Sequence, residues 1–338
     1  MTDEQVFEAV RELTGDAETA SVKADFLTVL AWKGETTEEI AAFARALQAM
    51  AIAPPLDAET RSRPILDVCG TGGDRLNTFN ISTTVALILA GAGVSVAKHG
   101  NRAVTSQAGS ADVLEALGIK IDLTPEQAAD SLRQHHFAFF FAPNYHPAFK
   151  EIMPARRLCG ERGERTIFNF LGPLLNPARP TAQLVGVPRR DLCIPIASVL
   201  QSLGVRRGMV VCGSVPRDGG IQGLDEFSTL GNNHVVDVPP TTPFLFVLRS
   251  VSPKWFPIQP ATLADLAGGD RQANAEIVRR VLHGDERGPK RDMVLLNCAA
   301  ALFVVEKCGS LNEGWDMAAE LIDSGKAGKK LKELMAAY

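Results

Sequence analysis

The chain has 338 residues, 46% of them hydrophobic and 22% charged, and this balance is typical of a folded globular enzyme rather than a disordered protein. Its 35 Lys and Arg against 39 Asp and Glu give a formal net charge of −4. The sequence therefore lacks the overall positive field that gathers nucleic acid, and any basic site must be local.

The N-terminal part of the chain is expected to be helical. Apolar side chains recur at helical spacing between residues 4 and 51, and glycines separate the segments. Thr36 or Thr37 marks a helix start, because a threonine hydroxyl can accept a free backbone N–H and Glu38 follows in the first turn. A linker rich in proline comes next, so residues 1–63 are predicted to form a small helical domain.

From residue 65 onward, short β-prone runs alternate with helical patterns. Such alternation predicts a largely parallel sheet with right-handed crossovers. The run FAFFF at 137–141 is apolar throughout, as expected of a strand covered on both faces. The other expected strands are 65–69, 94–97, 184–187 and 209–212, and the expected helices are 83–90, 110–117 and one that Thr124 caps.

The last third of the chain is expected to hold a hairpin or loop excursion over 235–258. Amphipathic helices follow around 274–282, 293–305 and 314–322. Together these patterns predict an α/β fold with a mostly parallel central sheet flanked by helices, and a smaller all-helical domain. The predicted division gives the helical domain residues 1–63, with 147–178 packing on it, and gives the α/β domain residues 64–146 and 179–338.

The cysteines and the hydropathy pattern bear on location. Six scattered cysteines without a C-x-x-C pair favour reduced thiols over a zinc site or a disulfide framework. The start MTDEQVFEAV is acidic and amphipathic, unlike a secretory signal. The longest weakly polar run, 85–97, falls short of the roughly 20 apolar residues that a membrane span requires. We expect a cytoplasmic protein with no membrane partner and no nucleic-acid partner.

Three glycines directly follow the strand expected at 65–69, in the segment DVCGTGGD that ends at Asp74. Glycine lets the backbone approach a ligand closely, and successive N–H groups in such a turn bind anions. Taken alone, a turn of this kind is often structural. Arg75 occupies the third-glycine position of a dinucleotide fingerprint and no Gly-Lys-Ser/Thr follows, so neither a Rossmann loop nor a Walker loop is indicated.

The segment NIST, residues 80–83, stands at the start of the next expected helix. Hydroxyls and exposed N–H groups at a helix start suit a phosphate oxygen or a hydrated cation. Ser82 or Thr83 could equally serve as an ordinary cap. Two candidate anion sites so close together favour a ligand that carries more than one phosphate.

The segment KHGNR comes at the end of the following strand, at the sheet edge where α/β proteins bind ligands. Lys98 can neutralise a phosphate, and Asn101 offers both a donor and an acceptor to a polar substrate. His99 could act as a base, but a single histidine is more often a structural hydrogen-bonding group. Ser106 and Ser110 continue the polar loop into the next helix.

Asp225 and Glu226, in the segment GLDE, are adjacent carboxylates on an expected loop. Such pairs are usually only solvated. Beside a polyphosphate they become candidate ligands for Mg²⁺, which prefers carboxylates, phosphate oxygens and water.

Several segments together carry a family resemblance. In chain order they are KGETTEEI, GTGGD, NIST, KHGNR with the following GSADVLEALG, YHPA, RTIFNFLGPLLNPARP, GLDE and GGDRQANAEI. They resemble the anthranilate phosphoribosyltransferases of tryptophan biosynthesis, and the match covers nearly the whole chain.

The resemblance implies a nucleoside phosphorylase/phosphoribosyltransferase-like fold, a homodimer, and a substrate cleft at the hinge between two domains. It implies transfer of the phosphoribosyl group of 5-phosphoribosyl 1-diphosphate (PRPP) to the amine of anthranilate, with release of pyrophosphate and with Mg²⁺ as cofactor. Because this amine is a modest nucleophile, the main task of the enzyme is to stabilise the departing pyrophosphate with preorganised N–H groups and positive charge.

The resemblance also implies a set of site residues by motif. The substrate contacts are Gly70, Gly73, Asp74, Thr78, Asn80, Ile81, Ser82, Thr83, Lys98, His99, Gly100, Asn101, Arg102, Ser106, Ser110 and Arg156; the metal positions are Ser82, Asp225 and Glu226; the catalytic residues are Lys98, Asn101 and Arg156. In this scheme Arg156 pairs with the anthranilate carboxylate and orients the amine.

The chain departs from the family pattern in two segments, which are expected to alter the acceptor pocket. Cys212-Gly213 stands where many members have His-Gly, and a lengthened SVPRDGGIQ follows. The segment 158–163 is also longer than the usual connection. The phosphoribosyl half of the site is expected to be intact.

Two alternative functions stay open from the sequence. Pyrimidine nucleoside phosphorylases share the architecture, but they tend to follow the Lys-His pair with Ser-Thr, whereas this chain has KHGN. A non-catalytic relative that binds nucleic acid would have no need of Lys98, Asp225 and Glu226, and the acidic balance argues against it.

Overall fold

The computed structural model describes residues 1–103, 107–240 and 245–337 of the chain. Its centre is a sheet with the strand order β3-β2-β1-β4-β5-β7-β8, and β6 pairs with β5 outside this order. Neighbours from β3 to β5 run parallel, whereas β6, β7 and β8 run antiparallel to their partners. The strands are β1 Ile65–Gly70, β2 Ser95–Gly100, β3 Phe137–Phe141, β4 Ala182–Gly186, β5 Arg207–Arg217, β6 Gly220–Leu224, β7 Asn233–Val238 and β8 Val247–Val251.

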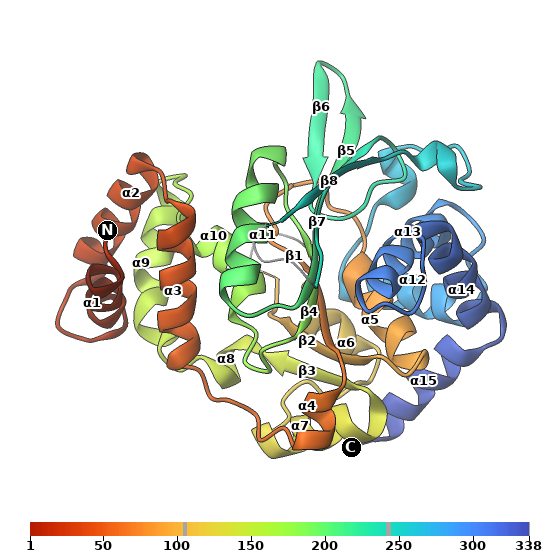
Figure 1. Cartoon of the computed structure of the whole chain (residues 1–338), viewed down its shortest axis with the longest axis horizontal. Coiled ribbons are helices and arrows are strands. Elements are labelled where there is room, and N and C mark those ends of the chain that lie inside the picture. Colours follow the sequence, from red (N-terminus) through yellow and green to blue (C-terminus); the bar gives the residue numbers. More distant parts are fainter. Residues whose placement is uncertain (104–106, 241–244, 338) are drawn as a thin grey trace.

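Helices cover both faces of this sheet, and a further helical group lies to one side of it (Figure 1). The predicted α/β class with a mostly parallel sheet is confirmed. None of the helices in the described ranges is long and apolar enough to cross a membrane. The helices are α1 Asp3–Thr14, α2 Ala20–Lys33, α3 Thr37–Ala49, α4 Ala58–Ser62, α5 Ile81–Gly91, α6 Ser110–Ala116, α7 Pro125–His135, α8 Ala142–Tyr145, α9 Phe149–Glu161, α10 Phe168–Leu171, α11 Cys193–Ser202, α12 Arg271–His283, α13 Pro289–Val304, α14 Leu311–Asp323 and α15 Lys326–Ala336, with 3-10 turns at Gly172–Leu175, Arg190–Leu192, Pro253–Trp255 and Leu263–Leu266.

Strand β2 is longer than its apolar run predicts, because it continues through Lys98 and His99 to Gly100. Parallel pairing with β3 sets Lys98 opposite Phe139 and His99 opposite Phe140. Backbone hydrogen bonds hold such a ladder whatever the side chain, so polar residues can occupy the end of a buried strand. The strand itself therefore positions these two side chains.

Several elements were not predicted from the sequence, among them α11, the β5–β6 hairpin and α15. The lengthened segment after Cys212 forms a β5–β6 hairpin, in which Val215 pairs with Gln222, and this hairpin projects from the body of the molecule (Figure 1). The C-terminal helix α15 packs against α5, α12 and α14. By contrast, the predicted helix cap at Thr124 is confirmed. Of the two threonines predicted as the helix start near residue 36, Thr36 is the N-cap residue of α3, and it forms a capping box with Glu39.

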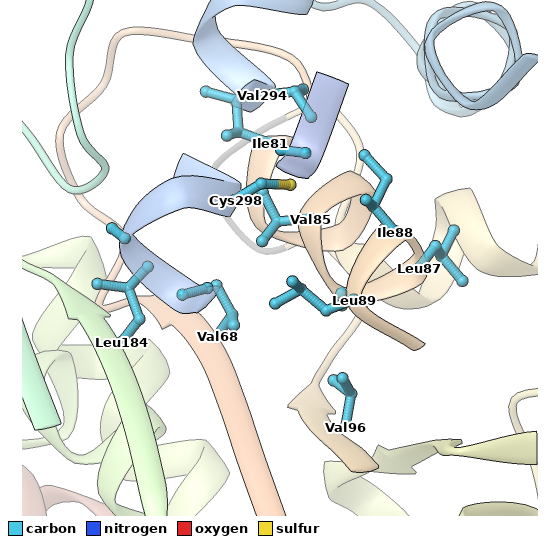
Figure 2. Close-up of a cluster of buried hydrophobic side chains, with 14 of the residues drawn as sticks. Val68, Ile81, Val85, Leu87, Ile88, Leu89, Val96, Leu184, Val294 and Cys298 are labelled. Carbon is cyan, nitrogen blue, oxygen red and sulfur yellow. The ribbon is translucent and has the colours of Figure 1, made fainter. Parts of the chain in front are cut away.

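Successive side chains along β4 and β5 point to opposite faces of the sheet and so enter two different hydrophobic cores. On β4, Leu184 faces one core and Val185 the other, and on β5 Val211 and Val210 divide in the same way. All four side chains are almost fully buried, as expected of a sheet covered on both faces. Figure 2 shows the first of these cores, where Val68 and Leu184 from the strands lie near helix α5 and Cys298 of α13.

The N-terminal helices do not cover the sheet directly. Helix α1 packs against α3, and α9 packs against both α1 and α2. Helix α3 in turn contacts α11, which lies on the sheet. Residues far apart in sequence, 3–49 and 149–161, therefore form one helical group at the side of the α/β body (Figure 1).

Candidate active site

The topology of the sheet places a crevice at the ends of β1 and β4. After β1 the chain moves to one side, adding β2 and then β3, and it later returns to add β4 on the other side of β1. Adjacent parallel strands whose connections leave in opposite directions form a switch point, where open α/β sheets bind ligands. The loop after β1 begins at Gly70, so the predicted diphosphate segment GTGGD lies at this point.

The acidic segment lies directly across these two strand ends. A Cβ atom at Gly70 or at Gly186 would collide with Asp225, so glycine is required at both positions for the close approach. The N–H of Gly72 donates to the Asp225 carboxylate at 2.6 Å. Residues 153 positions apart in sequence are thus joined at one loop, and the structure brings GTGGD and GLDE together.

Three carboxylates gather here. Burial raises the pKa of Asp225 well above its usual range, and the negative charges of Asp74 and Glu226 raise it further. Burial also raises the pKa of Glu226 to about 7, an effect that Lys98 and hydrogen bonds from Ser82 partly offset. Like charges held this close repel one another, so the cluster favours a cation between them.

Lys98 connects the carboxylates to the start of α5. Its side chain is only 2% exposed, and its Nζ donates to the carbonyl of Val68 at 2.8 Å and to Ser82 Oγ at 3.2 Å. Ser82 in turn hydrogen-bonds Glu226. Lysine, serine and carboxylate therefore form one buried network beside the segment GTGGD, residues 70–74, here called the glycine loop. This network fixes the position of the ammonium group.

The residues at the start of α5 differ in how well their positions suit the predicted phosphate contacts. Asn80 is the N-cap residue but makes no side-chain cap, and its Oδ1 is buried and accepts no hydrogen bond within the described ranges. Thr83 is buried in the first turn. The side chain of Ile81 lies in the core (Figure 2), and its N–H donates to the carbonyl of Phe79 at 2.8 Å. A contact between Ile81 and a phosphate would require that bond to open.

Thr78 lies on the approach to α5 and is held by a distant segment. It forms a β-bridge with Ala267, and the neighbouring N–H of Phe79 donates to the carbonyl of Leu266 at 3.2 Å. The motif GGDRQANAEI begins directly after this bridge. It thereby supports the loop that carries Thr78 rather than entering the crevice.

The loop after β2 carries several residues that are predicted to contact substrate, and these residues make different interactions in the structure. The backbone carbonyl of Asn101 accepts the N–H of Ala111 at 3.3 Å and Ser110 Oγ at 3.5 Å, which ties the loop to α6. Arg102 instead pairs with Asp112 and Glu115, each at 3.0 Å, and these carboxylates raise the pKa of its guanidinium. A substrate contact by Arg102 would have to break these pairs. Ser106 lies outside the described residues.

Aromatic rings connect β2 to the predicted acceptor arginine. The rings of His99 and His146 lie 5.2 Å apart, and His146 and Phe149 lie 5.4 Å apart. Phe149 meets Phe168 at 5.6 Å, and the guanidinium of Arg156 lies over the Phe168 ring at 5.2 Å. This series of side chains, here called the aromatic row, extends from the strand that carries Lys98 to Arg156.

Both histidines of the aromatic row are held neutral. Burial lowers the pKa of His99 to about 3, helped by the neighbouring His146, and burial lowers the pKa of His146 to about 4. His99 Nδ1 lies 3.2 Å from the carbonyl of Gly172. A neutral ring in edge-to-face contact with aromatic side chains suits the binding of a flat apolar ligand better than it suits proton transfer at neutral pH.

Sequence reasoning missed several residues that the structure places at the site. His146 lies in the motif YHPA and Phe149 directly follows it, and Phe168 lies in RTIFN; these motifs carry the family resemblance without indicating a role for the three residues. Gln222 and Arg165 donate to carbonyls of the glycine loop. The sequence signal of Gln222 is weak, since a glutamine in a glycine-rich stretch is an ordinary surface residue. Arg165 begins the motif RTIFN, but the motif alone gives it no role.

Comparisons with known proteins agree along the whole chain. Residues 62–328 match the family described as "Glycosyl transferase family, a/b domain", and residues 1–51 match "Glycosyl transferase family, helical bundle domain". The chain is 47% identical over 310 residues to the anthranilate phosphoribosyltransferase of Alkaliphilus metalliredigens, covering 92% of this chain and 86% of that protein.

Solved structures give the same result. The anthranilate phosphoribosyltransferase of Thermus thermophilus superposes with a TM-score of 0.88 at 38% identity, covering 100% of this chain and 95% of that one. The enzyme of Saccharomyces cerevisiae in complex with PRPP and Mg superposes with a TM-score of 0.85 at 26% identity, covering 99% and 92% of the two chains.

Proposed function

We infer that this chain, which belongs to the anthranilate phosphoribosyltransferase family, transfers the phosphoribosyl group of PRPP to the amine of anthranilate and releases pyrophosphate. The observation that best supports this reaction in the chain itself is a juxtaposition. A glycine loop with facing carboxylates and a buried lysine lies at the switch point, and the aromatic row connects it to Arg156.

We propose that the donor lies against the glycine loop, Lys98 and the start of α5. As the C1–O bond breaks, negative charge grows on pyrophosphate, and fixed N–H groups and the Lys98 ammonium stabilise charge where it develops. The buried position of Lys98 matters, because a charge removed from water acts more strongly on its neighbours. The orphaned Oδ1 of Asn80 adds an acceptor suited to a ribose hydroxyl.

We propose Mg²⁺ as the cofactor, held by Asp225, Glu226 and Ser82. The raised pKa values of the two carboxylates fit this role, because each would be relieved of its neighbour's negative charge by a cation. Two carboxylates suit Mg²⁺, because this ion binds through one or two carboxylates and substrate phosphates rather than in a protein cage, and when bound it would supply positive charge to the leaving group.

We propose that anthranilate occupies the aromatic row. Its ring would lie against the side of this row, where His99, His146 and Phe149 contact one another edge to face, while Arg156 pairs with its carboxylate. The contacts of Arg156 with Met153 Sδ (3.9 Å) and the Phe168 ring carry no negative charge, and burial lowers the pKa of its guanidinium. An incoming carboxylate would therefore meet a partly desolvated cation, which strengthens the pairing.

The reaction is tested by following the fluorescence of anthranilate in the presence of PRPP, Mg²⁺ and the purified protein. Consumption of anthranilate that depends on PRPP and releases pyrophosphate is the expected result. Turnover of uridine or thymidine with inorganic phosphate, without any consumption of anthranilate, would instead establish a nucleoside phosphorylase and refute the proposal.

Changing Arg156 to Ala is expected to raise the KM for anthranilate by about 10- to 100-fold, because a charged hydrogen-bonding pair is lost. The KM for PRPP should stay within about twofold, since Arg156 belongs to the acceptor side of the site. Steady-state kinetics with each substrate varied in turn gives both values. Arg157→Ala, at the exposed neighbouring position, is the control and should leave both values unchanged. Equal changes in the two KM values for the Arg156 variant would contradict the assignment.

We also propose a homodimer formed through the helical group. Helix α2 is apolar on two faces, since Leu27 and Leu30 are buried while Val29 is 60% exposed and Trp32 is 73% exposed. Contiguous exposed apolar side chains favour a protein interface. Sedimentation should give twice the chain mass, and Trp32→Glu should shift the protein toward the monomer. Ile194→Glu, a change at an exposed apolar position on α11, should leave the mass unchanged; a monomeric wild-type protein would contradict the proposal.

The division of the chain and its location complete the proposal. We propose that residues 1–63 with 147–178 act as one domain, residues 64–146 and 179–338 as the other, with the substrate cleft at their hinge. We propose a cytoplasmic location, supported by six cysteines that are all free. Alkylation in a fresh lysate should find every thiol reduced, whereas a disulfide would contradict it.

A further inference from the structure

Two side chains hold the glycine loop by its carbonyl groups. Gln222 Nε2 donates to the carbonyl of Asp74 at 2.6 Å, and Arg165 Nη2 donates to the carbonyl of Gly73 at 3.4 Å. Gln222 belongs to β6, and Arg165 belongs to the connection between α9 and α10. Two neighbouring peptide units of the loop are therefore fixed by separate parts of the chain.

Fixing a carbonyl also fixes an N–H group. In a trans peptide the C=O and the N–H of one unit point in opposite directions, and the described backbone contains no cis peptide. Holding the Asp74 carbonyl therefore aims the N–H of Arg75 away from Gln222. Holding the Gly73 carbonyl likewise aims the N–H of Asp74 away from Arg165. These are successive N–H groups of the loop, the kind that form an anion-binding nest.

The hairpin explains how Gln222 reaches the loop. Side chains alternate along β6, so Gln222 and the buried Leu224 point toward the body of the protein, while Ile221 points outward and is 76% exposed. Asp225 follows the strand at once and accepts the N–H of Gly72. The short segment from Gln222 to Asp225 therefore forms hydrogen bonds with the glycine loop at two places. This segment leads from the projecting hairpin back into the body of the molecule (Figure 1).

We propose that Gln222 is a positioning residue for the phosphoribosyl donor: it orients the N–H groups of the glycine loop toward the diphosphate, with Arg165 as a second, weaker hold. The proposal rests on the proposed function, since it concerns the donor half of that site. It predicts that the hydrogen bond of Gln222, and not merely its bulk, sets the affinity for PRPP.

The test compares Gln222→Met with Gln222→Ala and with the control Ile221→Ala. Methionine matches the length of glutamine but cannot donate, whereas Ile221 lies on the same strand and faces solvent. For both Gln222 variants, the dissociation constant of PRPP with Mg²⁺, measured by calorimetry without anthranilate, should rise by about fivefold, as expected for one lost hydrogen bond. The KM for PRPP should rise in step, while the KM for anthranilate and the melting temperature stay unchanged.

The possible results separate the roles. Wild-type donor affinity in Gln222→Met would overturn the proposal, because the hydrogen bond would then be without effect. A parallel rise in both KM values, or a fall in melting temperature that tracks the loss of affinity, would show a merely structural residue and overturn it too. A wild-type protein that binds PRPP but never consumes anthranilate would refute the proposed function alone, since the binding titration needs no acceptor.

Discussion

Changing the acidic pair together, Asp225→Asn with Glu226→Gln, is expected to lower kcat/KM for PRPP by about 100- to 1000-fold and to raise the Mg²⁺ concentration that half-saturates the reaction. The amides keep the shape of the side chains but remove the negative charges that would hold a cation. Steady-state kinetics over a range of Mg²⁺ concentrations measures both effects.

The same variant should gain stability in the absence of metal. Burial and the negative charge of Asp74 raise the pKa values of both carboxylates, and Glu226 raises that of Asp225 further, so at neutral pH their ionisation lowers the free energy of unfolding. Neutral amides remove that repulsion, and the substituted amide oxygen at position 225 can still accept the N–H of Gly72. We expect a melting temperature at or above that of the wild type without Mg²⁺, and a smaller rise when Mg²⁺ is added.

A matched control is Asp218→Asn at the tip of the β5–β6 hairpin, where the side chain is exposed. This change removes one carboxylate but should alter neither the kinetics nor the response to Mg²⁺. If the acidic-pair variant kept its full Mg²⁺ response and full activity, the metal would have to lie elsewhere, and the assignment of Asp225 and Glu226 would be wrong.

The fold could be predicted largely because its hydrophobic pattern is regular. Apolar runs such as 137–141 bury both faces and give a strong strand signal, and the alternation of strands and helices selects a parallel sheet. The prediction weakened where polar residues occupy strands. The end of β2, with Lys98 and His99, has no strand signal because these side chains are polar, although the backbone stays paired with β3.

The β5–β6 hairpin shows a different reason for failure. Its second strand contains two glycines, at positions 220 and 223, a third glycine precedes it in the turn, and the strand has few of the β-branched residues that mark a strand. The sequence placed the lengthened segment beside the acceptor, yet in the structure Gln222 contacts Asp74 in the loop proposed to bind the donor. The contact between Gln222 and Asp74 joins residues 148 positions apart, and no local sequence pattern predicts it.

The site followed from motifs, but the connections between them did not. The sequence marked the glycine loop, Lys98 and the acidic pair separately, and the sheet topology joined them at the switch point. The aromatic row could not be predicted, because His146 and Phe168 are common core residues whose alignment with Arg156 depends on how α9 packs. Arg102, a residue within a motif, pairs with Glu115 on the next helix, and its contact with substrate stays a prediction.

Changing Lys98 to Met is expected to lower kcat/KM for PRPP by about 100- to 1000-fold, because the change removes the buried ammonium that we propose lies beside the leaving group. Its Nζ has a fixed position between the Val68 carbonyl and Ser82 Oγ. Arginine should not restore activity, since a planar guanidinium is larger than the space an ammonium fills in this buried network. Initial rates measured at saturating anthranilate over a range of PRPP concentrations give kcat/KM for PRPP.

The lysine also stabilises the fold, which allows a second readout. Lys98 lowers the pKa of Asp67 and of Glu226, so its loss leaves both carboxylates buried without their counter-charge. The folded pKa values would rise further, and the free energy of unfolding should fall as the pH rises above the usual carboxylate range, since the unfolded chain then holds its protons less tightly than the folded one. Lys329→Met, at an exposed position on α15, is the control and should change neither activity nor stability. A folded Lys98→Met variant that keeps kcat/KM within about tenfold of the wild type would mean that this ammonium does not face the leaving group, because the loss of such a charge costs more than that.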